Sequence, residues 1–114
     1  MFVIVAGGRD FGNYQLLCTK LDFLFSKITP VIICGEARGA DSLGKRYAQE
    51  HNLQVLSFPA NWDKYGKSAG YRRNEEMAEK ADALVAFWDG KSKGTEHMIQ
   101  TMLKLNKRVK IVRY

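Results

Sequence analysis

Three segments of the sequence combine glycine with charged or hydroxyl-bearing residues, a pattern typical of phosphate-binding loops. They read GGRD at residues 7–10, GEARGAD at residues 35–41 and DGKSKGT at residues 89–95, and each follows an apolar run. Glycine lets backbone N–H groups approach an anion closely, and the N-terminus of a following helix adds partial positive charge. Glycine also serves tight turns that bind nothing, and none of the three is a Walker A sequence or a complete G-x-G-x-x-G fingerprint. Their coincidence in one chain favours a ligand.

Arg73 points to a bound anion for a different reason. It lies four residues before Met77, which places it on the inward-facing, apolar stripe of the helix that the sequence predicts here. A cation in the first turn of a helix also opposes the helix dipole. A bound anion explains both features, and an internal ion pair with Asp10 or Asp41 is the alternative. The neighbouring Asn74 either caps the helix or hydrogen-bonds the ligand.

Two aromatic residues, Trp62 and Tyr65, lie in residues 59–70, the one long segment that the sequence predicts to be irregular. Loops of this length inside small domains often serve a function. Their aromatic side chains either stack on a nucleobase, which would suit a phosphate site, or pack the loop onto the domain. Trp88 allows the same two interpretations.

The candidate ligand-binding residues lie in or beside these segments. They are Gly7, Gly8, Arg9, Asp10, Gly35, Arg38, Gly39, Asp41, Trp62, Tyr65, Arg73, Asn74, Asp89, Gly94, Thr95 and His97. We expect the glycines and Thr95 to hold phosphate or ribose, and Asp41 to accept from ribose hydroxyls or to orient Arg9. No Cys/His cluster has metal-ligand spacing, so we expect neither a metal site nor a bound cofactor.

The elements that must position these residues follow from the apolar pattern. Five short runs, rich in β-branched residues, predict strands at residues 2–6, 31–34, 55–58, 83–87 and 109–112. Helical periodicity separates them, most clearly over residues 14–28, with Asn13 as the N-cap. This alternation predicts an α/β fold: a single Rossmann-like domain over residues 1–114, with a mostly parallel five-stranded sheet flanked by helices on both faces. Ligands of such sheets bind beyond the carboxyl ends of the strands, where the three glycine segments would meet.

Composition and charge indicate which partners the domain has and where in the cell it works. The 114 residues carry a formal net charge of +6, and Lys and Arg crowd towards the C-terminal end, which suggests an anionic partner. No apolar run approaches the ~20 residues that span a bilayer, and no secretory leader is recognisable. We therefore expect a cytoplasmic protein without a membrane partner. Cys18 and Cys34 are expected to be small core residues rather than a disulfide.

Taken together, these motifs resemble a known family. GGRDF at residues 7–11, GEARGAD at residues 35–41 and the block from residue 59 to residue 99 are similar to small SLOG-superfamily proteins of bacteria and phages. The branch is the YspA-related one, or YAcAr, once called domain of unknown function 2493. The resemblance covers nearly the whole chain. It implies a Rossmann-like fold and the binding of nucleotides or nucleotide-derived ligands.

A more distant resemblance concerns possible chemistry. RRNEEMAEKADALVAFWDGKSKGTEHM, residues 72–98, is similar to a block of the LOG-type phosphoribohydrolases, which cleave the N-glycosidic bond of nucleoside monophosphates with an arginine and a glutamate. Arg73 matches the arginine. His97 and Met98 stand where the glutamate is expected, and Glu96 is one residue early, about 100° around a helix. This departure argues against hydrolysis.

Residues 35–41 also resemble the GxARGID segment of the DNA-processing protein A family, which binds single-stranded DNA. The resemblance is confined to that segment, and the basic C-terminal end is compatible with it. DNA is therefore a possible partner that ranks below a small nucleotide.

The function predicted from the sequence is the binding of a nucleotide or nucleotide-derived phosphate ligand, for sensing or sequestration. Whether the chain is an enzyme stays open. The first alternative is an N-glycosidase, with Arg73, Asp41 and Glu96 as candidate catalytic residues and with Asp10 or Asp89 as other carboxylates that could stabilise an oxocarbenium-like charge. The second alternative is single-stranded DNA binding. Relatives often self-associate, so a homo-oligomer is also expected.

Overall fold

The computed structural model describes residues 1–114, and its centre is a five-stranded sheet in which every neighbouring pair of strands is parallel. The strand order is β3-β2-β1-β4-β5. The strands are β1 (Phe2–Gly7), β2 (Val31–Cys34), β3 (Val55–Ser57), β4 (Ala83–Trp88) and β5 (Arg108–Arg113). The predicted fold class is confirmed: a Rossmann-like α/β sheet, here parallel throughout.

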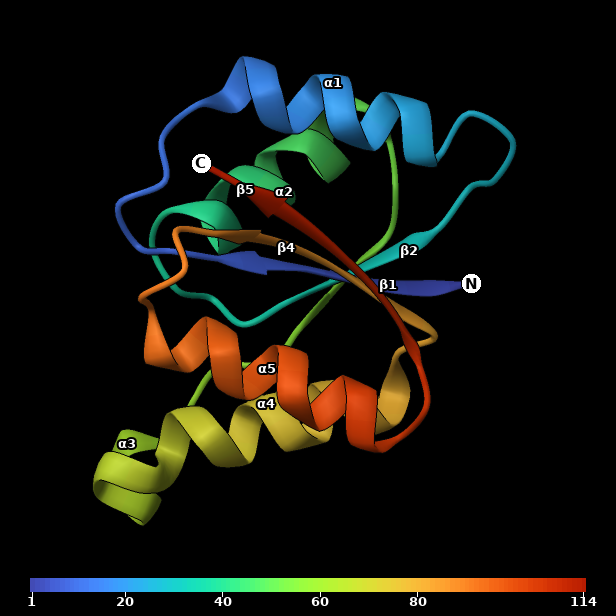
Figure 1. Cartoon of the computed structure of the whole chain (residues 1–114). Coiled ribbons are helices and arrows are strands. Elements are labelled where there is room, and N and C mark those ends of the chain that lie inside the picture. Colours follow the sequence, from blue (N-terminus) through green and yellow to red (C-terminus); the bar gives the residue numbers. More distant parts are fainter.

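Four main helices cover the two faces of the sheet. Figure 1 shows α1 (Tyr14–Leu24) and α2 (Ala40–Glu50) on one side, and α4 (Ala69–Lys80) and α5 (Lys93–Lys104) on the other. Successive residues of β1 point to opposite faces, so Val3 and Val5 pack with α1 and α2, whereas Ile4 and Ala6 pack with α4 and α5. Burial on both faces is the physical reason why the strands read as continuous apolar runs.

Helix α1 begins where the sequence predicts and ends earlier. The side chain of Asn13 accepts a hydrogen bond from the N–H of Leu16 at 3.0 Å and so caps the helix, as expected. The helix ends at Leu24, and Ile28, which was expected to continue its apolar stripe, lies beyond it with 40% of its surface exposed. The apolar stripe therefore predicts the buried face of α1 correctly as far as Leu24 and is wrong for the turn that follows.

Residues 59–70, predicted to be irregular, are mostly helical. They form α3 (Trp62–Tyr65), a 3-10 turn (Gly66–Ser68) and the start of α4 at Ala69. Side chains stabilise these short turns: Asn61 caps α3 by accepting from the N–H of Lys64 at 3.1 Å. Because α4 begins this early, Arg73 lies in its second turn, and the expected conflict with the helix dipole does not arise.

The parallel arrangement collects the carboxyl ends of all five strands at one edge of the sheet. The loops that follow β1, β2 and β4 meet there, as does the C-terminal residue, whereas the N-terminus lies at the opposite edge (Figure 1). This edge of the sheet is called the loop rim below. No helix of the chain combines the length and the apolar character needed to cross a bilayer.

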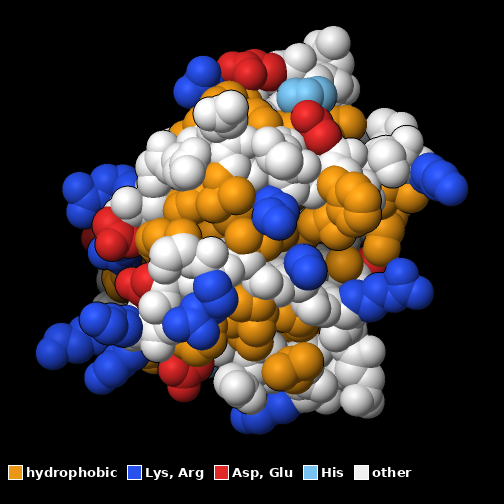
Figure 2. Space-filling view, turned by 45° about the horizontal axis from the view of Figure 1, so that its top comes forward, with side chains coloured by type: hydrophobic (Ala, Val, Ile, Leu, Met, Phe, Trp, Pro, Cys, Tyr) orange, Lys and Arg blue, Asp and Glu red, His pale blue; other side chains and the backbone are white.

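The basic C-terminal stretch is partly used for structure. Lys107 donates from Nζ to the backbone oxygens of Ala78, at 2.7 Å, and Glu79, at 3.0 Å. The guanidinium of Arg113 lies over the ring of Trp88, 5.4 Å from its centroid. On the face shown in Figure 2, several Lys and Arg side chains gather at the left margin beside Asp and Glu side chains, and others stand singly among apolar atoms.

Candidate ligand-binding site

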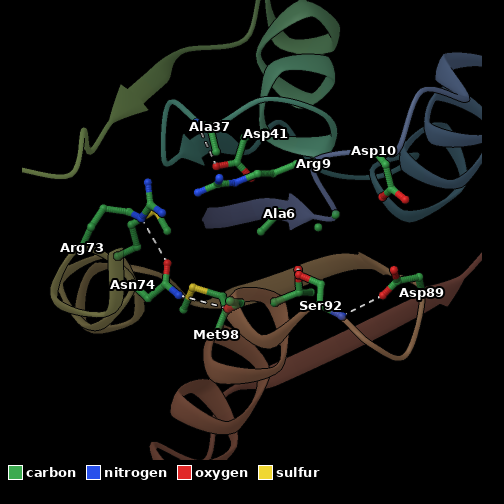
Figure 3. Close-up of a pocket in the computed structure, with 15 residues that line it drawn as sticks. Ala6, Arg9, Asp10, Ala37, Asp41, Arg73, Asn74, Asp89, Ser92 and Met98 are labelled. Carbon is green, nitrogen blue, oxygen red and sulfur yellow. Dashed lines mark hydrogen bonds between the residues drawn. The ribbon is translucent and has the colours of Figure 1, made fainter. Parts of the chain in front are cut away.

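A cavity of about 400 Å³ opens at the loop rim, a volume within the range of small-molecule sites. Ten of the predicted site residues line it: Gly7, Gly8, Arg9, Asp10, Asp41, Arg73, Asn74, Asp89, Gly94 and Thr95. Sequence reasoning missed five others, namely Ala6, Ala37, Met77, Ser92 and Met98. The end of β1, three loops and the helices α2, α4 and α5 therefore enclose one space, although they come from distant parts of the sequence (Figure 3).

The glycines of the first two loops are closely packed against neighbouring backbone or side-chain atoms. A Cβ on Gly39, whose φ is +74°, would lie 2.2 Å from the backbone oxygen of Gly8. The same oxygen accepts from the N–H of Ala40 at 3.2 Å, and the N–H of Gly8 donates to Phe87 at 3.0 Å. The N–H groups of Gly8 and Ala40 are therefore paired within the protein, and the phosphate-binding role expected of these glycines stays a prediction.

The start of α5 also borders the cavity. The helix begins at Lys93, and its N-cap, Ser92, makes no side-chain cap hydrogen bond. The first N–H groups of a helix have no partner within the helix. Gly94 and Thr95 line the cavity in this first turn, where the helix dipole favours negative charge.

Asp41 lies at the base of the second loop with only 6% of its surface exposed. Its Oδ2 accepts from the N–H groups of Gly35, at 3.2 Å, and Ala37, at 3.4 Å. Burial raises the pKa of this carboxyl, and the nearby charge of Arg73 opposes that shift. A Cβ on Gly35 would lie 2.7 Å from Nη1 of Arg73 and 2.8 Å from Oδ2 of Asp41, so only glycine fits between these two groups.

Arg73 is half-buried on α4 and reaches across to the second loop. Its guanidinium donates to the backbone oxygen of Gly35, and its Nε donates to Oδ1 of Asn74 at 3.1 Å. Burial lowers the pKa of Arg73, the nearby charge of Asp41 opposes that shift, and the charge of Arg9 lowers the pKa by a smaller amount. The ion pairs of the chain are Lys45–Glu36, Arg46–Glu50 and His51–Asp22, so neither Arg9 nor Arg73 forms one. The predicted alternative of an ion pair between Arg73 and Asp10 or Asp41 is wrong.

Asn74 connects the two helices that border the cavity. It is 6% exposed, and its Nδ2 donates to the backbone oxygen of Gly94 and approaches Nδ1 of His97, both at 3.2 Å. Burial lowers the pKa of His97, so its ring is neutral at pH 7 and accepts this hydrogen bond. His97 packs against Tyr71 with ring centroids 4.4 Å apart and does not line the cavity.

Two carboxylates stand at the far end of the cavity from Arg73, as Figure 3 shows for Asp10 and Asp89. Oδ1 of Asp89 accepts from the N–H groups of Lys91, at 2.8 Å, and Ser92, at 2.9 Å, which lowers the pKa of Asp89 and holds the loop. Oδ1 of Asp10 accepts from the hydroxyl of Tyr114 at 2.7 Å. The cavity therefore has an arginine end and an acidic end.

A second cavity, of about 270 Å³, adjoins the first at its arginine end. The two share Arg9, Ala37 and Arg73, and the second adds Gly35, Arg38 and Trp62 from the predicted set. A Cβ on Gly70 would lie 3.6 Å from the Trp62 indole and 3.8 Å from Nη2 of Arg73, so the ring and the guanidinium are neighbours. Trp62 is 52% exposed and lines this cavity.

The remaining predicted residues lie outside both cavities. Tyr65 packs beneath the guanidinium of Arg72, 4.4 Å from its ring centroid. Glu96 is exposed on α5, and Gly39 contacts the first loop without lining either space. Trp88 donates from Nε1 to the backbone oxygen of Ser92 at 3.0 Å. Of the two roles that the sequence allowed for Trp88, this contact agrees with packing of the loop.

Comparisons with known proteins agree with this architecture. A family model described as the YspA, cpYpsA-related SLOG family matches residues 1–65, which confirms the resemblance to the SLOG superfamily. Gene 61 protein of Mycobacterium phage D29 is 38% identical over 80 residues, which cover 65% of this chain and 64% of that protein. The match thus spans less than two thirds of that relative.

Two solved structures share the fold. DNA processing protein A from Streptococcus pneumoniae superposes with a TM-score of 0.78 over 99% of this chain and 50% of its own length, at 14% identity. The structural-genomics protein TM1055 superposes with a TM-score of 0.69 over 95% of this chain and 71% of its own, at 20% identity. At these identities the likeness establishes the fold alone.

Proposed function

The chain belongs to the YspA, cpYpsA-related SLOG family, and from that premise we propose that it binds a nucleotide-derived ligand through its phosphate at the loop rim. The family and the fold favour a nucleotide-related function in general. The finer assignment to this cavity rests on its residues.

One observation carries the proposal: the guanidinium groups of Arg9 and Arg73 approach each other at the cavity wall without any carboxylate partner in ion-pair distance. Two like charges in a partly buried site repel each other, and burial disfavours the charged form of Arg73, an effect that the nearby carboxyl of Asp41 offsets in part. A phosphate between them would offset both effects with charge-assisted hydrogen bonds. The unpaired N–H groups at the start of α5 face the same cavity and add a second anion-binding element.

Binding assays with paired arginine variants test this proposal. Calorimetric titration of the purified protein with AMP should give saturable binding, and Arg73→Ala should weaken it about tenfold or more, because a hydrogen bond to a charged group contributes about 1.5–3 kcal/mol. Arg72→Ala is the matched control, because this neighbouring cation packs on Tyr65 away from the cavity. Equal losses in both variants, or no binding of any nucleotide, would contradict the proposal. Mass spectrometry of any small molecule that co-purifies would give the ligand directly.

Cleavage of an N-glycosidic bond is the second candidate function, and the position of Asp41 favours it. This buried carboxyl with a raised pKa lines the same cavity as Arg73, and Glu96, the other candidate, lies outside it. Asp41 would stabilise the oxocarbenium-like charge that develops as the bond breaks. The test is chromatography of a nucleotide incubated with the protein: free base that disappears in Asp41→Asn supports an enzyme, and intact nucleotide recovered in full supports a binding protein.

A further inference from the structure

The charges of the two adjoining cavities divide them into parts suited to different chemical groups. The second cavity presents three guanidinium groups, those of Arg9, Arg38 and Arg73. Its one carboxylate, Glu36, is already paired with Nζ of Lys45 at 3.1 Å. An excess of positive charge therefore remains at this end, where an anionic group would be most stable.

The opposite end of the first cavity has the reverse character. Asp10 and Asp89 each use only Oδ1 in hydrogen bonds with other residues, which leaves the second carboxylate oxygen available. Ser92 and Thr95, whose hydroxyls lie 3.1 Å apart, line the same cavity. Carboxylate oxygens repel phosphate and accept hydrogen bonds from hydroxyl groups. A hydroxyl-rich group suits this end.

Trp62 supplies the third part. Its indole is half-exposed at the second cavity, which the guanidinium of Arg73 also lines. An aromatic ring in this position can stack on a nucleobase whose phosphates reach the arginines. Tyr65, the other aromatic residue expected to stack on a base, packs against the guanidinium of Arg72 and lines neither of the two cavities.

We infer that the two cavities form one bipartite site for a diphosphate-bridged nucleotide, a nucleoside diphosphate that carries a second, hydroxyl-rich group. This inference rests on the proposed function and specifies its ligand. The base stacks on Trp62, the diphosphate lies along the wall shared by Arg9 and Arg73, and the hydroxyl-rich group extends towards Asp10 and Asp89. A mononucleotide fills only part of this space.

A ligand series tests each part of the site. With the full chain and calorimetric titration, we expect ADP to bind about tenfold more tightly than AMP. A sugar-bearing diphosphate, ADP-ribose or ADP-glucose, should bind at least as tightly as ADP despite the added bulk. Trp62→Ala should weaken ADP about tenfold and leave ribose 5-phosphate unchanged, with Phe23→Ala, an aromatic residue 80% exposed on α1, as the matched control. Arg38→Gln should weaken ADP more than AMP. Asp10→Asn should weaken the sugar-bearing ligand more than ADP.

The outcomes separate this inference from the proposal on which it rests. Suppose that AMP binds in an Arg73-dependent way and that the sugar-bearing diphosphates bind no more tightly than AMP. The bipartite site is then wrong, and the proposed function stands. Equal effects of Trp62→Ala on ribose 5-phosphate and ADP would also overturn the bipartite site. If no member of the series binds, both fail.

Discussion

Gly35 shows how a single position determines the character of the site. It holds Arg73 and Asp41 close together without an ion pair, because its backbone binds both: the oxygen accepts from the guanidinium and the N–H donates to the carboxylate. Any side chain at this position would force the two apart, since a Cβ would fall within 3 Å of each. The sequence motif alone suggested a phosphate contact here, whereas the structure gives the glycine a spacing role.

Asp41 should make the stability of the protein depend on pH in an unusual direction. Because burial raises its pKa above the ordinary value of 3.8, the native state holds this proton more tightly than the unfolded chain does. The stabilisation is complete below pH 3.8 and is lost as the pH rises through the raised pKa. At pH 7 the ionised carboxylate therefore leaves the native state less stable than a neutral group would.

Asp41→Asn should accordingly raise the free energy of unfolding at pH 7, and the gain over the wild type should shrink as the pH falls towards 3.8. The amide oxygen can still accept from Gly35 and Ala37. Urea denaturation across this pH range measures the difference, with Asp63→Asn, an exposed carboxylate of α3, as the control. A variant less stable than the wild type at pH 7 would show that the charge of Asp41 is stabilising.

At the scale of elements, the contact between the N-terminus of α2 and the first loop sets the shape of the loop rim. Gly39→Ala places a Cβ against the Gly8 backbone and forces a conformation that side chains avoid, so it should destabilise the protein by about 2 kcal/mol or more. Gly94→Ala in the first turn of α5 meets no atom within 4 Å and should be neutral or stabilising by up to about 1 kcal/mol. Urea denaturation midpoints of the two variants compare them; similar midpoints would mean that the first loop can move away from α2 at little cost.

The sequence predicts the elements that have one strong signal and misses those that depend on distant contacts. The strands around Val3–Val5 and the cap at Asn13 are readable because local burial and a local hydrogen bond produce them. The early start of α4 is not readable, since Gly66 and Gly70 look like helix breakers. Gly70 lies inside α4, where an added Cβ would make ordinary contact with the Trp62 indole at 3.6 Å.

The same distinction applies to the candidate site. The convergence of the three loops follows from strand order and could be predicted, as could the inward position of Arg73. The role of Tyr114 could not, because the hydroxyl that holds Asp10 comes from the other end of the chain, 104 residues away. The pairing of loop amides within the protein is likewise a property of the folded backbone.

At the scale of the whole molecule, the net positive charge should have little effect on the affinity of the loop-rim site for a nucleotide. Arg108 and Lys110 are exposed on β5 and line neither cavity at the loop rim. Replacing both by glutamine should leave nucleotide affinity unchanged within about twofold, because water and salt screen distant surface charges. Calorimetric titration with AMP checks this.

The same double variant distinguishes the DNA-binding alternative. If single-stranded DNA were the ligand and these residues contacted it, each lost phosphate contact would reduce the slope of log affinity against log salt by about 0.7. A salt titration with an oligonucleotide measures that slope. We expect no such change.

The polarity of the sheet has a practical consequence for anyone who handles this protein. Met1 lies at the edge away from the loop rim, whereas Tyr114 contacts Asp10 at the rim itself. An affinity tag or a surface linkage attached before Met1 would leave the mouth of the cavity open to soluble compounds. The same attachment after Tyr114 would crowd the entrance and could mimic a loss of affinity.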